Sequence, residues 1–193
     1  MSIEVLKSIV DFFASHAAIL GILSAIIGFV AKHNSDRRLS SYEARLSFVR
    51  DQLKELYGPL FLLSESNDKV WGEFRQQFRS GREMFDAANP LSVAEKAEYV
   101  RWLEVAFVPC NEKMRRTIER SAHLFIDGSA PSSVLDLLAH FDALNVILSK
   151  LKDGSDDNVF PVVIYPKDFG AHIRNDYAKV VQRHARLTSG WNA

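Results

Sequence analysis

The sequence contains a single cysteine, and this scarcity excludes two classes of site. Cys110 has no second cysteine with which to form an internal disulfide or a C-x-x-C metal or redox pair. Such usage fits a reducing compartment. Because Cys110 follows Pro109 in an apolar stretch, we expect a packed side chain rather than a nucleophile.

The chain also has no excess of either charge, with 24 Lys and Arg against 24 Asp and Glu. The chain as a whole therefore does not attract nucleic acid or an acidic partner electrostatically, and any such contact must involve a local cluster of charges. The common catalytic signatures are missing as well: there is no phosphate-cradling glycine loop, no H-E-x-x-H and no G-x-S-x-G. The sequence predicts no cofactor and no metal, and it weighs against an enzyme.

Permanent charge is absent from Phe12 to Ala31, a run that reads FFASHAAILGILSAIIGFVA. Twenty helical residues measure about 30 Å, the thickness of the hydrocarbon core of a bilayer. A cleaved signal peptide needs a basic start and a shorter run, whereas Glu4, Lys7 and Asp11 precede this one. We therefore expect a transmembrane segment within residues 1–35, with the span at about residues 10–31.

Basic residues are concentrated just after this run, whereas Lys7 and the terminal amine precede it: Lys32, His33, Arg37, Arg38, Arg45 and Arg50. Cytoplasmic flanks carry the excess of Lys and Arg. We expect a single pass with the N-terminus outside and residues 36–193 in the cytoplasm.

Small residues recur at steps of three or four within the run and so share one helix face: Ala17, Gly21, Ala25 and Gly28. Such faces let helices approach closely in lipid, which favours a homo-oligomer. The alternative is that Gly and Ala are simply common in membrane helices.

A polar strip formed by Asp11 and Ser15 lies near the N-terminal end of the run. An acid at membrane depth is unfavourable unless it meets water or a partner, so the strip would suit a pore mouth. The alternative places Asp11 at the level of the lipid headgroups.

A heptad seam of apolar residues follows: Leu39, Tyr42, Leu46, Val49, Leu53, Leu56 and Leu60. This helix either pairs with copies of itself or forms the spine of an intrachain bundle, and the amphipathic segments that follow favour the bundle. Pro59 kinks or ends this helix, and Pro109 separates two later ones.

Further helix signals predict that residues 36–193 form an all-α bundle of five or six helices. Ser92 and Glu95 have the spacing of a capping box, which opens one helix. Ser132 or Ser133 is expected to cap another.

One weak catalytic candidate remains, the pair Arg116 and His123. Its spacing resembles the R-x(4–6)-H motif of the helical ribonucleases called higher-eukaryote-and-prokaryote nucleotide-binding (HEPN) domains. In such a pair an Arg holds a phosphate while a His moves the proton of a ribose 2′-hydroxyl. The other interpretation makes Arg115, Arg116 and Arg120 a solvated basic face.

Several short motifs resemble a group of uncharacterised bacterial helical proteins that often carry one N-terminal membrane helix. They are Leu53-x-x-Leu56-Tyr57-Gly58-Pro59-Leu60, Trp71-x-x-Phe74 and Phe107-Val108-Pro109-x-Asn111-x-x-Met114, with His123-Leu124 and Asp127-Gly128. The layout is also similar to the membrane accessory proteins of RNA-targeting CRISPR systems, which join one membrane helix to a HEPN-like bundle and form a ring-shaped pore.

These resemblances imply an effector of anti-phage defence in the bacterial inner membrane, which oligomerises and permeabilises the bilayer. A protein partner, or an RNA or nucleotide signal, would act on the cytoplasmic bundle. Two alternatives stay open: a membrane-tethered ribonuclease that uses Arg116 and His123, and a passive membrane anchor for a partner protein.

Overall fold

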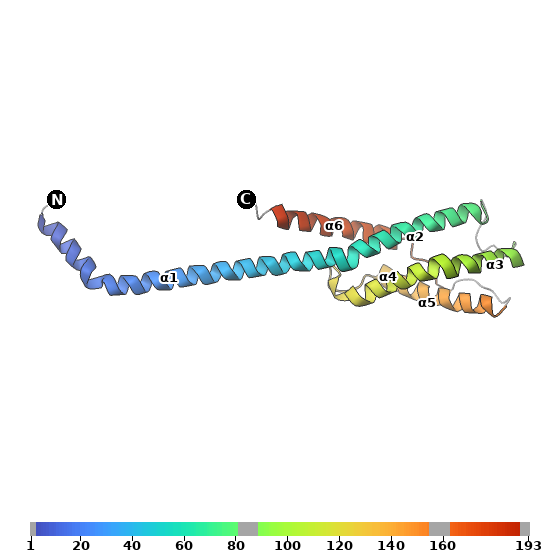
Figure 1. The fold of residues 1–193 in the computed structure, drawn as a ribbon, viewed down its shortest axis with the longest axis horizontal. Coiled ribbons are helices and arrows are strands. Elements are labelled where there is room, and N and C mark those ends of the chain that lie inside the picture. The colour runs from blue at the N-terminus through green and yellow to red at the C-terminus, as the bar shows by residue number, and fades with distance from the viewer. Residues whose placement is uncertain (1–2, 81–88, 155–162, 190–193) are drawn as a thin grey trace. The chain divides into compact units, whose positions relative to one another are not determined.

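The computed structural model describes residues 3–80, 89–154 and 163–189, and these are almost entirely helical (Figure 1). No β-strand element occurs in these ranges, so the predicted all-α class is confirmed. The elements in order are α1 (Ile3–Asp51), the π-helix η1 (Gln52–Tyr57), α2 (Gly58–Gln77), α3 (Val93–Trp102), the π-helix η2 (Leu103–Phe107), α4 (Val108–Ser121), the 3₁₀ turn η3 (Ala122–Leu124), α5 (Ser132–Lys152) and α6 (Phe169–Ser189).

The chain divides into two compact units, Met1–Ser47 and Phe48–Ala193. Most of α1 makes up the first unit, and the second contains the last residues of α1 together with α2 to α6. The five helices α2 to α6 agree with the predicted bundle of five or six.

Helix α1 is hydrogen-bonded from Ile3 to Asp51, but its axis bends by 60° between the arm Ile3–Ala17 and the arm that begins at Gly21. The bend lies inside the predicted span at about residues 10–31. In the part of the chain that the structure describes, no single helix is long and apolar enough to cross a membrane. The arms Ile3–Ala17 and Gly21–Gln77 meet that condition only as a pair, by length and composition.

Two side chains just before the bend bind carbonyl groups of their own helix. Ser15 Oγ donates to the carbonyl of Asp11 at 2.7 Å, and His16 Nδ1 lies 2.9 Å from the carbonyl of Phe12. A side chain that hydrogen-bonds to the carbonyl four residues earlier competes with the helix backbone, and such competition can bend the helix. Gly21, which follows, has no side chain that would oppose a bend. The sequence signal for the bend was present in these residues but was not recognised.

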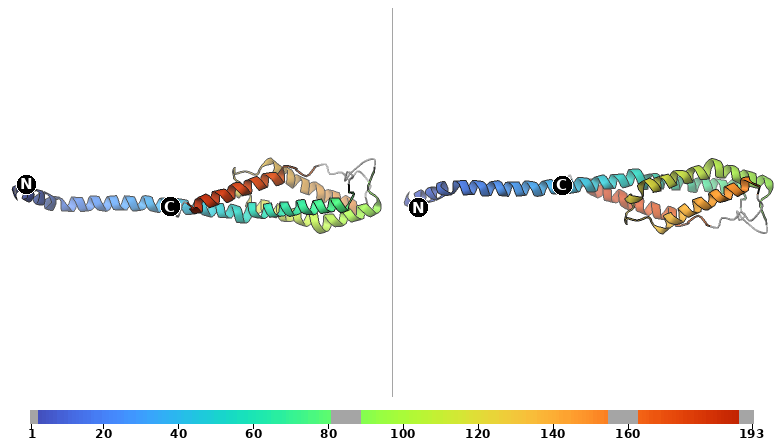
Figure 2. Two further views of the ribbon diagram at one scale, coloured as in Figure 1. Left: turned by 90° about the horizontal axis from the view of Figure 1, so that it is seen from above. Right: turned by 90° about the horizontal axis from the view of Figure 1, so that it is seen from below.

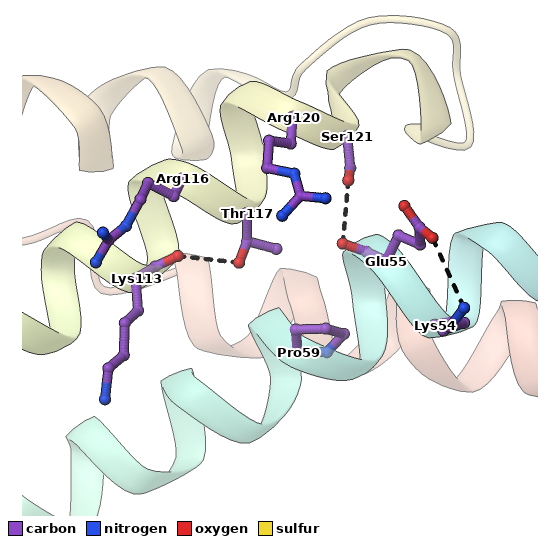
Figure 3. Close-up of a pocket in the computed structure, with 8 residues that line it drawn as sticks. All are labelled: Lys54, Glu55, Pro59, Lys113, Arg116, Thr117, Arg120 and Ser121. Atoms are coloured by element: carbon purple, nitrogen blue, oxygen red, sulfur yellow. Dashed lines mark hydrogen bonds and ion pairs between the residues drawn. The ribbon is translucent and has the colours of Figure 1, made fainter.

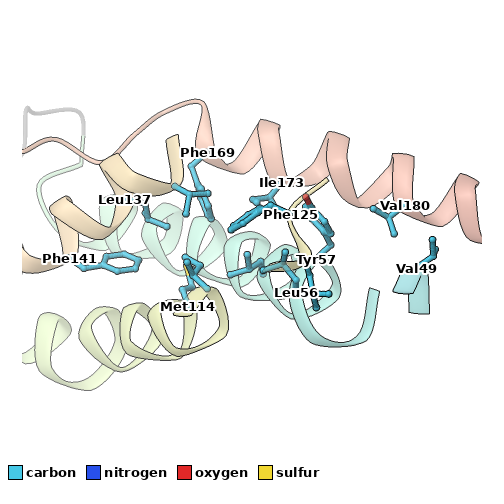
Figure 4. Close-up of a cluster of buried hydrophobic side chains, with 14 residues drawn as sticks. Val49, Leu56, Tyr57, Met114, Phe125, Leu137, Phe141, Phe169, Ile173 and Val180 are labelled. Carbon is cyan, nitrogen blue, oxygen red and sulfur yellow. The ribbon is translucent and has the colours of Figure 1, made fainter. Parts of the chain in front are cut away.

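The main core of the second unit lies between the end of α1, η1, α2, α4, α5 and α6 (Figure 4). Its centre is made by large apolar side chains with almost no solvent exposure: Val49, Leu56, Tyr57, Leu60, Met114, Leu137, Phe141, Phe169, Ile173 and Val180. Each such side chain contributes roughly 1.5–3 kcal/mol through burial. This core holds η1 against α4, which fixes the site described below.

The π-helix η1 is explained by the proline that follows it. Pro59 has no backbone N–H, so the carbonyl of Glu55 loses its usual donor, and the hydroxyl of Ser121 on α4 donates to it at 3.1 Å. The N–H of Gly58 reaches back five residues to the carbonyl of Leu53. A Cβ at Gly58 would lie 2.4 Å from that oxygen, so the π-helix requires glycine here.

The second π-helix, η2, has the same relation to Pro109. It ends at Phe107, and the N–H of Val108 donates to the carbonyl of Leu103, five residues earlier. Both prolines thus enter helices without ending them, because the preceding turn widens to release the carbonyl groups that the rings obstruct.

An aromatic cluster joins α2 to α3 and η2. The ring of Phe74 is surrounded at centroid distances of 4.9 to 6.1 Å by the rings of Trp71, Phe78, Tyr99, Trp102 and Phe107. Offset and edge-to-face aromatic pairs each add about 0.5–1.5 kcal/mol beyond burial.

The predicted capping box at the start of α3 is confirmed. Ser92 accepts from the N–H of Glu95, and the Glu95 carboxylate accepts from the N–H of Ser92 at 2.8 Å. The same carboxylate accepts from Nε of Arg79 at 3.0 Å, and Arg79 also donates to the carbonyl of Pro90. These bonds hold Arg79 in the left-handed region, at φ 54°.

The start of α5 differs from the prediction that Ser132 or Ser133 caps it. The helix begins at Ser132, and the N-cap is Pro131, whose side chain makes no capping bond. The carbonyl of Pro131 accepts from the N–H groups of Val134 and Leu135 instead. Proline already holds its φ near the helical value, so the turn starts without a polar cap.

Candidate functional site

A basic pocket of about 410 Å³ lies between η1, the start of α2, and α4 in the second unit (Figure 3). Helix α4 presents one face to it through residues at steps of three and four, and η1 and α2 form the other wall. The lining residues are Lys54, Glu55, Pro59, Lys113, Arg116, Thr117, Arg120 and Ser121. The cavity therefore holds four cationic side chains and one carboxylate.

Three of these cations have no ion-pair partner among the described residues: Lys113, Arg116 and Arg120. Other arginines of the same unit are paired, such as Arg115 with Asp142 and Arg174 with Glu65. The Nε of Arg116 donates to the carbonyl of Glu112 on its own helix, which leaves its terminal nitrogens available. Positive charge is thus left uncompensated at this pocket.

The hydroxyl groups of the pocket already have acceptors. Thr117 donates to the carbonyl of Lys113 at 2.9 Å, and Ser121 donates to the carbonyl of Glu55. The carboxylate of Glu55 lies 4.0 Å from Nζ of Lys54. The donors that remain for a ligand are therefore the cationic groups.

Of the sequence-predicted pair, Arg116 lines the pocket and His123 does not. His123 is exposed on the 3₁₀ turn η3, beyond Ser121, where the helical backbone breaks at φ −119° and ψ 19°. No bond joins the two side chains in the described structure. A catalytic role for this pair stays a prediction.

Sequence reasoning singled out Arg116 and Arg120 but missed Lys54 and Lys113. Lys113 stands three residues before Arg116, and Arg120 stands four after it, so their common face was readable from spacing. Lys54 comes from a separate element, and only the fold brings it to the same cavity.

The residues of the predicted membrane face are exposed in the first unit: Ala17, Gly21, Ala25 and Gly28. A Cβ at Gly21 or at Gly28 would meet nothing within 4 Å. Asp11 and Ser15 of the polar strip are exposed too. The 60° bend falls between Ala17 and Gly21, inside the predicted face.

The predicted heptad seam is divided between the two units. Val49, Leu56 and Leu60 are fully buried in the core of the second unit, and Leu53 packs against that core. The earlier residues of the seam belong to the first unit: Leu39, Tyr42 and Leu46.

Three shifted pKa values outside the pocket arise mainly from burial. Burial raises the pKa of the Cys110 thiol and of the Tyr165 hydroxyl, and it lowers the pKa of His140. Each of these shifts favours the neutral form, as in structural side chains. Within the described ranges no group of His, Cys, Asp and Glu is arranged to hold a metal ion.

Comparisons with known proteins give no match to this chain among family models, curated proteins or solved structures.

Proposed function

We propose that the chain is a membrane-anchored effector, whose N-terminal helix enters the bilayer and whose helical unit stays in the cytoplasm. The observation that carries this proposal is the exposed apolar surface of α1 between Ile9 and Val30. It is formed by Ile9, Val10, Phe12, Phe13, Ile19, Ile22, Leu23, Ile26, Ile27, Phe29 and Val30, each at least 44% exposed. An apolar surface of this extent marks a membrane or an interaction site, and the lack of any permanently charged residue from Phe12 to Ala31 favours lipid.

The polar groups within this segment are compatible with lipid because they bond to their own helix. Ser15 Oγ donates to a backbone carbonyl of the preceding turn, and His16 Nδ1 lies 2.9 Å from another, which reduces the cost of placing both side chains in lipid. The basic residues from Lys32 to Arg38 lie after the segment and support a cytoplasmic position for the rest of the chain.

Residues at steps of three and four form one polar stripe on the arm Ile3–Ala17: Glu4, Lys7, Ser8, Asp11 and Ser15. If copies associate in the membrane, the stripe supplies the polar groups that a shared aqueous lumen requires. This arrangement supports permeabilisation of the bacterial inner membrane. The defence role rests on the resemblance in layout to the CRISPR accessory proteins.

The test measures insertion and permeabilisation separately in bacteria that express the chain. We expect it to resist alkaline extraction from the membrane fraction, and we expect a potential-sensitive dye to report depolarisation once infection triggers the effector. Extraction by alkali would overturn the anchor. A stable membrane potential under every infection trigger, with insertion intact, would overturn the effector and leave the passive anchor.

A ribonuclease that uses Arg116 and His123 is the alternative from another class. It predicts that Arg116→Ala and His123→Ala each abolish RNA cleavage without lowering thermal stability. The exposed position of His123 outside the basic pocket weighs against it.

A further inference from the structure

The size of the basic pocket limits what it can hold. A volume of about 410 Å³ lies in the usual range for small-molecule sites. A nucleic-acid helix is far larger than such a cavity, so the occupant must be a small molecule or a single group of a larger one.

The excess of positive charge in the pocket favours the binding of an anion. Lys113, Arg116 and Arg120 come from α4 and Lys54 comes from η1 on the other wall, and Glu55 is the one carboxylate among the lining residues (Figure 3). Like charges that line one hollow repel one another, and an anion bound there relieves that repulsion. Guanidinium and ammonium groups bind phosphate oxygens through charge-assisted hydrogen bonds, and two arginines can do so bidentately.

The lining also indicates which part of the ligand is recognised. None of the lining residues is aromatic, so the pocket offers no platform on which a base could stack. The hydroxyl groups of Thr117 and Ser121 are already committed to backbone carbonyls. Recognition therefore falls on phosphate groups, and four cations exceed what a single phosphate needs.

We propose that this pocket binds a soluble small molecule that carries at least two linked phosphate groups, held by Lys54, Lys113, Arg116 and Arg120. Membrane insertion and this site are separate properties, because all of the lining residues belong to the second unit.

The experiment uses the full chain in a nonionic detergent and measures binding by calorimetry. The probes are inorganic triphosphate, ATP and inorganic monophosphate, without added metal. We expect triphosphate and ATP to bind with similar affinity, and monophosphate to bind at least tenfold more weakly. Arg116→Gln and Arg120→Gln should each weaken triphosphate binding on the order of tenfold, as expected for the loss of one charge-assisted contact.

Arg101→Gln is the matched control. Arg101 is an exposed arginine of α3 that pairs with Glu98 outside the pocket, so its loss removes the same charge without touching the site. We expect this variant to bind triphosphate like the wild type. Thermal unfolding of all three variants should stay close to that of the wild type. Arg116 and Arg120 are exposed and form no ion pair in the described structure, and the exposed pair of Arg101 with Glu98 adds little stability.

Three results would overturn the proposal. The first is no measurable binding of triphosphate or ATP to the wild-type chain. The second is an equal loss of affinity in Arg101→Gln, which would indicate a general charge effect. The third is Arg116-dependent binding only to cardiolipin in mixed micelles, which would assign the pocket to a lipid headgroup instead of a soluble ligand.

Discussion

Two glycines of α2 differ in what a side chain would meet, and this difference gives a direct stability test. A Cβ at Gly58 would lie 2.4 Å from the carbonyl oxygen of Leu53, whereas a Cβ at Gly72 meets nothing within 4 Å. We expect Gly58→Ala to lower the free energy of unfolding by about 3 kcal/mol, because backbone must move to admit the methyl group. Gly72→Ala should raise it by up to about 1 kcal/mol through helix propensity.

Denaturant unfolding of both variants measures the contrast. Equal effects of the two substitutions would show that η1 does not constrain residue 58.

Ser121 and Pro59 should be energetically coupled through the carbonyl of Glu55. Removing the hydroxyl in Ser121→Ala leaves that partly buried acceptor without its donor, at a cost of about 1–2 kcal/mol. In a Pro59→Ala background the new N–H of residue 59 can serve the same carbonyl, so the cost of Ser121→Ala should fall. A double-mutant cycle on the free energy of unfolding checks this. Strictly additive effects would contradict the shared acceptor.

Glu95 makes the stability of the helical bundle depend on pH in the acidic range. Hydrogen bonds from Arg79, and then from the backbone and hydroxyl of Ser92, lower the pKa of Glu95 to about 2, against an ordinary value of 4.5. A carboxyl whose pKa is lowered by folding stabilises the protein above the unfolded pKa and loses that contribution as the pH falls through the folded one. Stability should therefore decline between about pH 4.5 and pH 2.

Glu95→Gln should flatten this part of the stability curve, measured by urea unfolding across the same pH range. An unchanged acid dependence in the variant would assign it to other carboxyl groups.

At the scale of the element, the proposed association of α1 through Gly21 and Gly28 can be tested with paired substitutions. Gly21 and Gly28 lie seven residues apart, so replacing both with Leu should preserve insertion and separate neighbouring helices. Ile22→Leu with Phe29→Leu is the control, since it has the same spacing on an adjacent line. We expect only the glycine pair to lose the oligomer in detergent. If the glycine variant migrates like the wild-type oligomer, the copies do not associate through the Gly21 and Gly28 face.

The helices were predictable from the sequence because their apolar residues recur at helical spacing and their ends carry recognisable signals. The capping box at Ser92 marked a real helix start. Pro59 and Pro109 were expected to kink or end helices, but the helical backbone continues through both because a π-helical turn precedes each one. The bend before Gly21 was missed because it depends on side chains that bond to their own backbone. Only the α4 side of the basic pocket could be predicted from the sequence. The spacing of Lys113, Arg116 and Arg120 places them on one helix face, whereas no spacing relates them to Lys54 on another element.

At the scale of the whole molecule, the two units should differ in their solubility and in their association with membranes. The second unit, Phe48–Ala193, contains the whole of the main core, whereas the first exposes apolar side chains along α1. We expect a fragment that begins at residue 40 to remain in the supernatant without detergent and to unfold cooperatively. The full chain should sediment with membranes. A fragment that fails to unfold cooperatively would show that the core needs the removed helix.

Each π-helix can also be viewed as an α-helix into which one extra residue has been inserted. Deleting one residue from 52–57 would restore ordinary α-helical bonding there but rotate Val49 by about 100° from the core that it shares with Val180. A helix with such an insertion next to a proline is one residue longer than the same helix without it. In any relatives of this protein, single-residue gaps should therefore fall within residues 52–57 or 103–107, next to Pro59 and Pro109, rather than inside the regular helices.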